Sequence, residues 1–136
     1  MKTLEDLNSL CSSTLMGHLS ISFKEITEDT IVAEMPVDER HVQPFGRLHG
    51  GASLALAESV ASAGSWALLD NDRAAVFGTE VSGSHVGTAG KGTVVTARAS
   101  LLHRGRLHHV WEVNISNEAG KPVSYCRVTN TIVMPV

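Results

Sequence analysis

The segment HGGASLALAESVASAGSWALL, residues 49–69, decides how the rest of the chain is interpreted. Thirteen of the eighteen residues from Gly50 to Ala67 are Gly, Ala or Ser, and Glu58 is the only formal charge between Arg47 and Asp70. Ala and Leu favour a helix, the paired glycines suit its start, and the acidic run at 70–72 suits its end. We therefore expect one long helix, enclosed by a sheet or by a partner chain, that carries a single isolated carboxylate.

The segments around this helix predict strands. Leucines at positions 4, 7 and 10, preceded by Thr3 as a candidate N-cap, first predict a short amphipathic helix. Alternation of apolar and polar residues then predicts strands over 19–26, 30–37, 74–86, 92–102, 108–116 and 123–133. Antiparallel strands with one helix against a face of the sheet give an α+β domain, and open sheet edges favour pairing with a second copy.

Composition limits the classes of function. A chain of 136 residues can form one domain, predicted over 1–136, and the balance of 11 Lys plus Arg against 14 Asp plus Glu argues against nucleic acid as a partner. Cys11 and Cys126 lie far apart without a CxxC motif, so neither a metal site nor a disulfide framework is expected. The first residues lack an apolar run of signal length, and the one long apolar window contains Glu58 with several Ser and Gly. We expect a cytoplasmic protein with no membrane partner.

Three features converge on the start of the long helix. Backbone N–H groups at Gly50 and Gly51 lie at the positive end of the helix dipole, where they could stabilise an oxyanion. His49 and Gln43 precede them and could orient a carbonyl or a water molecule. Glu58 stands in an apolar setting that suits a general base or a nucleophile.

The spacing of these groups has a consequence for assembly. Gly50 and Glu58 are separated by eight residues, which is roughly 12 Å along a helix axis. A reacting carbonyl must lie about 3 Å from both an oxyanion donor and the attacking group. If both groups act on one carbonyl, Glu58 must come from a second subunit, and the site then lies at a homodimer interface.

The run QPFGRLHGGASLALAES, residues 43–59, resembles the signature of the hotdog-fold acyl-CoA thioesterases. Within that family it is similar to the PaaI and 4-hydroxybenzoyl-CoA thioesterase-like branch, which includes 1,4-dihydroxy-2-naphthoyl-CoA hydrolase and the enterobactin proofreading thioesterase. The similarity extends through MPVDER, VFGTEVSGSHV and LLHRGRLHHVWEV to the last strand. It implies an antiparallel sheet wrapped around one helix, with the subunits assembled as dimers and further as tetramers.

The resemblance also implies roles for residues of the long helix and its approach. Glu58 falls at the catalytic carboxylate, either as nucleophile or as general base. Gly50 falls at the backbone N–H that polarises the thioester carbonyl, with Gln43 and His49 beside it. Ser62 matches a hydroxyl that helps to hold the attacking water.

The substrate contacts implied by the resemblance lie outside the helix. His85 matches a residue of the acyl pocket, and the positions that match coenzyme A contacts are Gly78, His85, Val86, Gly87, Thr88, His103, Arg104, Gly105, Arg106 and His108. Relative to the family pattern this chain carries an extra residue between Lys91 and Trp111. From their charge alone, the cations that could meet the coenzyme's phosphates are Arg104, Arg106, Arg98 and Lys91.

The leading hypothesis is hydrolysis of an acyl-CoA thioester with an aromatic or other small acyl group, such as hydroxybenzoyl- or dihydroxynaphthoyl-CoA. No metal and no cofactor is expected, apart from the coenzyme A of the substrate. The alternatives are a proofreading hydrolase of carrier-protein thioesters, a hotdog lyase and a non-catalytic acyl-CoA-binding module.

Simpler structural roles also remain open for several residues. His49 could simply cap the helix, Gln43 could be a turn residue and Ser62 a packing residue. The remaining histidines His18, His41 and His109 are expected at the surface or at strand ends.

Overall fold

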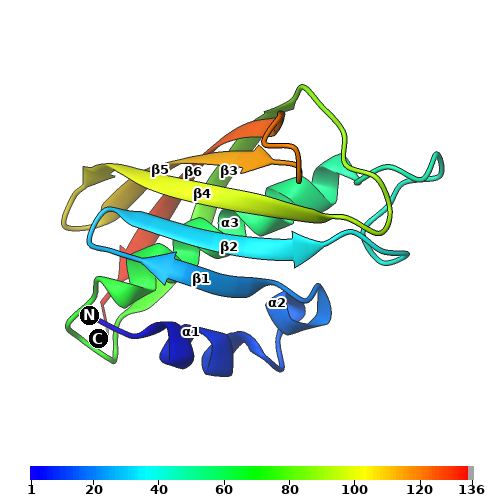
Figure 1. The fold of residues 1–136 in the computed structure, drawn as a ribbon. Helices are drawn as coiled ribbons and strands as arrows, with labels where there is room; N and C mark the ends of the chain where they lie inside the picture. Colours follow the sequence, from blue (N-terminus) through cyan, green and yellow to red (C-terminus); the bar gives the residue numbers. More distant parts are fainter. Residues whose placement is uncertain (135–136) are drawn as a thin grey trace.

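The computed structural model describes residues 1–134, which form a six-stranded antiparallel sheet around one long helix (Figure 1). The helices are α1 (Leu4–Cys11), α2 (Leu15–His18) and α3 (Gly50–Ala67). The strands are β1 (Ser22–Ile26), β2 (Thr30–Pro36), β3 (Ala75–His85), β4 (Val94–Arg104), β5 (His108–Ser116) and β6 (Pro122–Val133). The sheet order β1-β2-β4-β5-β6-β3 confirms the expected α+β hotdog arrangement. Residues 135 and 136 of the predicted domain lie outside the described residues.

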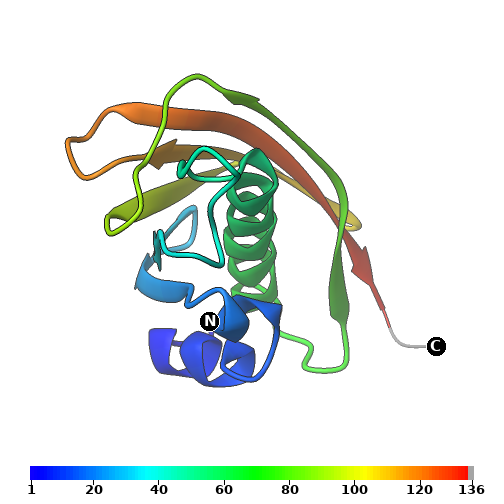
Figure 2. The ribbon, with the colours of Figure 1, turned by 90° about the vertical axis from the view of Figure 1, so that its right-hand side faces the viewer.

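The central helix α3 is the one that the small-residue segment predicts. It starts at Gly50 with His49 as its N-cap and ends at Ala67, just before the acidic run at 70–72. Figure 2 shows the sheet curving around it. Because most of its buried side chains are small, the inner face of the sheet can approach the helix closely, as the sequence predicts.

The N-terminal segment contains one predicted helix and one that the sequence does not predict. In α1, Thr3 Oγ1 accepts a hydrogen bond from the Asp6 N–H (3.1 Å), and Asp6 Oδ2 accepts one from the Thr3 N–H (2.9 Å). These bonds form a capping box and hold the pKa of Asp6 below its usual range. The four residues of α2 are too few to give a helical period. The first strand begins at Ser22, three residues later than predicted, because residues 19–21 form the turn that follows α2.

Strand β4 extends beyond its predicted end at residue 102 and is irregular there. Its pairing with β5 shifts between Leu101 and His103, which leaves Leu102 as an extra residue in one strand. Such a β-bulge accommodates an inserted residue without breaking the sheet. The bulge lies between Lys91 and Trp111, the segment in which the resemblance implies one extra residue.

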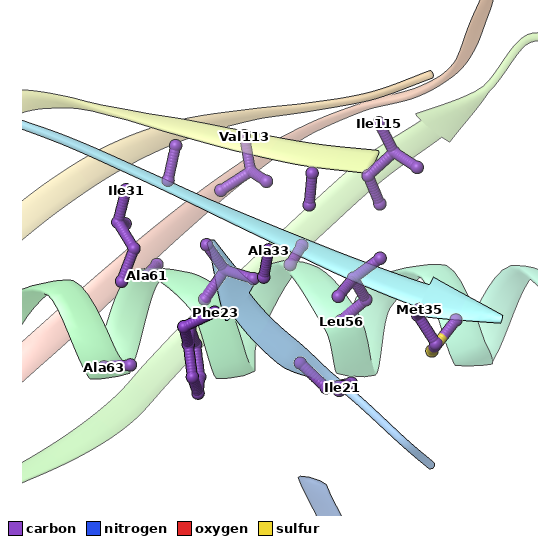
Figure 3. Packing of buried hydrophobic residues seen from close by; sticks show 14 of the residues in the cluster. Ile21, Phe23, Ile31, Ala33, Met35, Leu56, Ala61, Ala63, Val113 and Ile115 are labelled. Atoms are coloured by element: carbon purple, nitrogen blue, oxygen red, sulfur yellow. The ribbon is translucent and has the colours of Figure 1, made fainter. Parts of the chain in front are cut away.

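The core lies between α3 and the inner face of the sheet. Figure 3 shows Ile31 and Met35 pointing from β2 toward the helix, on which Leu56 and Ala61 lie. All four side chains are fully buried. Trp111 of β5 is the largest fully buried side chain of the described residues, and its ring packs against α3 at Gly64.

A Gly64→Ala variant is expected to be less stable, although Ala is the better helix former. A methyl group at residue 64 would lie 2.8 Å from Trp111 Cη2 and 3.0 Å from Ile31 Cγ2. Such overpacking costs about 1–3 kcal/mol, whereas helix propensity favours Ala by about 1 kcal/mol. Urea unfolding at one fixed protein concentration measures the free energy of unfolding. A gain in stability would contradict the close packing of Trp111.

The two edges of the sheet are β1 and β3. Helix α1 lies beside β1 (Figure 1), whereas β3 pairs only with β6 among the described residues. Strand β3 is eleven residues long, most of its residues are exposed, and the Phe77 side chain is 56% exposed. A long edge of this kind leaves backbone N–H and C=O groups available to another strand.

Candidate active site

The loop before α3 presents the N-terminus of the helix. Val42 and Leu48 form an isolated antiparallel bridge, and the Gln43 N–H donates to the Arg47 carbonyl (2.8 Å). Gly46 closes this turn with a φ of +79°, a value that favours glycine. The loop is therefore a tight hairpin that leads directly into Gly50.

His41 anchors the same loop, and its expected surface position is wrong. The side chain is fully buried, with Nε2 2.7 Å from the Leu19 carbonyl oxygen and Nδ1 3.0 Å from Asp38 Oδ1. Hydrogen bonds from Arg40 hold the pKa of Asp38 well below its usual range. A histidine without a partner motif in the sequence thus ties the loop to the segment after α2.

At the helix start, His49 acts as a cap. Its Nδ1 accepts a hydrogen bond from the Gly51 N–H (2.8 Å), so the ring leaves the Gly50 N–H as the donor at the tip. Among the hydrogen bonds of residues 1–134, the Gly50 N–H has no acceptor. The expected oxyanion donor is available, and the cap role considered for His49 is confirmed.

His85 lies against the helix tip within the same chain. A methyl group at residue 50 would lie 2.8 Å from His85 Nε2, so the absence of a side chain at Gly50 makes room for the imidazole. On the other side of the ring, Nδ1 lies 2.7 Å from the hydroxyl of the buried Ser124. Ser124 fixes the orientation of His85, and the sequence gives no indication of this pair.

Gln43 makes turn contacts, and its amide nitrogen remains available as a donor. Its Oε1 accepts hydrogen bonds from the Phe45 N–H (2.6 Å) and the Arg47 N–H (3.3 Å). Because the oxygen is engaged, the NH₂ group has no protein acceptor in the described part of the chain. The turn role is confirmed, and it orients the amide as a donor.

The carboxylate of Glu58 lies beside β3, at Gly78. A methyl group at residue 78 would lie 2.7 Å from Glu58 Cδ, so only glycine leaves room for the carboxylate there. Glu58 is half-buried and lines a cavity of about 350 Å³ with residues of α2, α3 and β3. Within residues 1–134 the carboxylate has no hydrogen-bond or ion-pair partner, and it is therefore available to a water molecule or a substrate.

Ser62 lines the same cavity one turn after Glu58. Its hydroxyl donates to Oδ1 of the buried Asn130 (3.1 Å). A hydroxyl that donates its proton still offers lone pairs as acceptors. Ser62 therefore has a fixed orientation beside the carboxylate.

One chain does not bring all predicted site residues together. Gly50 and Glu58 lie on the same continuous helix, roughly 12 Å apart along its axis. His85 contacts the N-terminal end of α3, whereas Arg104 Nη2 donates to the Leu68 carbonyl at the opposite end (3.2 Å). Figure 1 shows the β4–β5 hairpin and the loop after β3 at opposite ends of the sheet. The two segments implied for coenzyme A contacts, 85–88 and 103–108, therefore lie far apart within one chain.

The candidate phosphate-binding cations differ in their surroundings. Arg98 lies on the sheet face away from α3, where it pairs with Glu25 (3.7 Å), and Lys91 pairs with Glu39 (3.1 Å). Arg106 is exposed at the tip of the β4–β5 hairpin, without an ion pair among the described residues. Of these candidate cations, Arg106 is therefore the one whose guanidinium has no hydrogen-bond or ion-pair partner among the described residues.

The described residues contain no group of three or more His, Cys, Asp and Glu arranged to hold a metal ion. In the same part of the chain, no helix is long and apolar enough to cross a membrane. Cys11 and Cys126 are both free and buried.

The structure also shows polar contacts beside the candidate site that the sequence does not predict. Asn130, Ser65, His109 and Trp111 form a buried polar cluster behind Ser62. His109 lies at the start of β5, so the expected strand-end position holds, but the expected surface exposure is wrong because its side chain is only 2% exposed. The alternation of apolar and polar residues in β6 could have identified Asn130, because it places this polar residue at an inward-facing position between the buried residues Val128 and Ile132.

Comparison with known proteins gives one consistent result. The family model described as Thioesterase superfamily matches residues 45–124. The chain is 40% identical to the 1,4-dihydroxy-2-naphthoyl-CoA hydrolase of Escherichia coli over 131 residues, which cover 96% of this chain and 95% of that protein.

Solved structures agree with this result. A thioesterase of Pseudomonas aeruginosa, crystallised as a Gln→Ala variant, is 38% identical with a TM-score of 0.92, and the match covers 98% of this chain and 95% of that chain. A thioesterase of Haemophilus influenzae is 40% identical with a TM-score of 0.91, over 98% and 92% of the two chains. The expectation of an enzyme that hydrolyses thioesters is confirmed, and the chain belongs to the Thioesterase superfamily.

Proposed function

We propose that this protein hydrolyses an acyl-CoA thioester to a free carboxylic acid and coenzyme A. The observation that carries the proposal is the unpartnered carboxylate of Glu58 in a cavity, on a helix whose tip offers the free Gly50 N–H. Its relative in Escherichia coli is named for hydrolysis of such an ester. A thioester carbonyl is a good electrophile and a thiolate leaves readily, so these two groups suffice without a cofactor.

In the proposed reaction, Glu58 takes a proton from water as the water oxygen attacks the carbonyl carbon. The Gly50 N–H and the helix dipole stabilise the negative charge that develops on the carbonyl oxygen. The carbon–sulfur bond then breaks, and the thiolate leaves and takes up a proton. Direct attack by Glu58 would instead give an acyl anhydride that water hydrolyses. In single-turnover hydrolysis in ¹⁸O-water, label in the Glu58 carboxylate identifies the anhydride route, because water then attacks the Glu58 carbonyl of the anhydride.

The active site is proposed to form between two subunits. The distance between Gly50 and Glu58 on α3 supports this arrangement, as does the separation of segments 85–88 and 103–108. The open edge of β3 could pair with the same strand of a second copy, which would bring two α3 helices side by side in opposite directions. Each dimer would then hold two equivalent sites, and we propose that dimers assemble further into tetramers.

The walls of the Glu58 cavity favour an apolar acyl group. Met16, Val76 and Phe77 line it, and a second cavity of about 190 Å³ shares Met16, Ser62 and Val76 with it. Trp66 lines the second cavity, together with residues of α1. An aromatic or other small acyl group, such as hydroxybenzoyl or dihydroxynaphthoyl, suits these walls. The free, buried cysteines are compatible with a reducing cytoplasm as the place of the reaction.

A panel of aryl, phenylacetyl, naphthoyl and fatty acyl-CoA esters tests the proposal, with release of the thiol as the readout. We expect turnover of an aromatic ester and little turnover of long fatty acyl esters. Faster hydrolysis of the matching carrier-protein thioester would identify the proofreading alternative. Tight binding without thiol release, or addition of water to an enoyl thioester, would contradict the proposal.

A further inference from the structure

A buried polar cluster lies between α3 and strands β5 and β6, directly behind Ser62. Its centre is Ser65 Oγ, which is 2.8 Å from Trp111 Nε1, 2.9 Å from Asn130 Nδ2 and 2.9 Å from His109 Nδ1. Each of these side chains is at most 2% exposed. Polar groups buried to this extent are costly unless each is satisfied, so the cluster has a fixed pattern of donors and acceptors.

The donors and acceptors can be assigned from chemistry. The indole N–H of Trp111 and the amide nitrogen of Asn130 can only donate, and they occupy both lone pairs of the Ser65 hydroxyl. The Ser65 proton therefore goes to His109 Nδ1, which makes His109 a neutral imidazole with its proton on Nε2. Burial is the main cause that lowers the pKa of His109, with contributions from the nearby Arg104 and His103, and it keeps the ring neutral.

This pattern fixes the orientation of the Asn130 amide. Its nitrogen is held by Ser65, so its oxygen points to Ser62 and accepts the Ser62 hydroxyl proton (3.1 Å). Ser62 in turn lines the Glu58 cavity. A serine that donates into the protein interior presents only lone pairs to the cavity.

We infer that Asn130 is a positioning residue, which binds the Ser62 proton and so makes Ser62 an acceptor for the water that Glu58 activates. The inference rests on the proposed function. One proton of the water then points to Glu58 and the other to Ser62, which directs an oxygen lone pair at the carbonyl carbon. Asn130 contacts neither substrate nor water, and it acts through Ser62.

A double-mutant cycle tests this inference. Ser62→Ala and Asn130→Ala are each expected to lower kcat by about tenfold, the worth of one oriented hydrogen bond, and to leave KM nearly unchanged. Because both remove the same interaction, the double variant is expected to lose about tenfold as well, not about a hundredfold. Ser62→Thr keeps the hydroxyl and is expected to retain activity.

Val128→Ala is the matched control for lost packing, because Val128 is a fully buried, inward-facing residue of the same strand that lies opposite Trp111 but makes no side-chain hydrogen bond in the cluster. It is expected to lower thermal stability and leave kcat unchanged. If Asn130→Ala does not fold, Ser65→Ala replaces it in the cycle, since it removes the anchor of the Asn130 amide.

The possible outcomes separate this inference from the proposed function. Losses that multiply in the double variant, or an unchanged kcat in Ser62→Ala, would overturn the inference even where Glu58→Ala is inactive. Wild-type turnover by Glu58→Ala would remove the proposed function, and this inference with it.

Discussion

A Glu58→Gln variant is expected to lose at least about 10²-fold in kcat, with KM nearly unchanged. Glutamine has almost the same shape and still fits beside Gly78, but it cannot take a proton from water or attack the carbonyl. The carboxylate lies in the cavity without a partner among the described residues, so its replacement breaks no ion pair there. Thiol release under saturating substrate measures the loss.

Glu112→Gln is the control for this variant. Glu112 is exposed on β5, on the sheet face away from α3, and its replacement is expected to change kcat by less than about twofold. Circular dichroism and thermal unfolding should match the wild type for both variants. Wild-type kcat in Glu58→Gln would show that this carboxylate takes no part in the reaction.

A Gly50→Pro variant is expected to lose about 10²- to 10³-fold in kcat, the range for removal of one oxyanion donor. Proline has no N–H, and it is tolerated at the first position of a helix, where the N–H has no helical partner. His49 has φ −68° and ψ 133°, which is the conformation preferred before proline. The variant should therefore fold and lack only the proposed donor, which kinetics and thermal unfolding test together.

Gly50→Ala is the matched control, since it adds a side chain and retains the N–H. Both substitutions add a Cβ at residue 50, and a Cβ there would lie 2.8 Å from the His85 ring. Both variants therefore disturb that ring to a similar degree. We expect Gly50→Ala to retain much more activity than Gly50→Pro. Equal losses in the two variants would assign the effect to His85 and would contradict the role of the Gly50 N–H.

The fold was largely predictable because its signals are local. The small-residue run at 50–67 has the composition of a helix with close neighbours, and period-two alternation marks the strands of the sheet. Helix α2 was not predictable, since four residues carry no helical period and depend on Thr14, whose side chain accepts from the Met16 N–H. The bulge at Leu102 depends on register with β5, which no single segment encodes.

The candidate site residues that lie in one continuous segment could be predicted from the sequence. Gly50 and Glu58 both belong to the small-residue run at 50–67, and Glu58 is conspicuous there as the only charged residue. The contacts of Glu58 with Gly78, of Gly50 with His85 and of Ser62 with Asn130 join segments far apart in the chain. They arise from the packing of α3 against β3 and β6, so only the folded structure shows them.

The central claim is that Glu58 of one subunit acts with the Gly50 N–H of another, and subunit mixing tests it most directly. Glu58→Gln and Gly50→Pro subunits, each nearly inactive alone, are co-expressed with different tags, and the mixed assemblies are assayed for thiol release. A mixed dimer holds one site with both groups intact and one site with neither, so random assembly in equal amounts is expected to restore about a quarter of wild-type activity. If activity stays at the level of the separate variants although mixed dimers form, the two groups do not act across the interface, and the account is wrong.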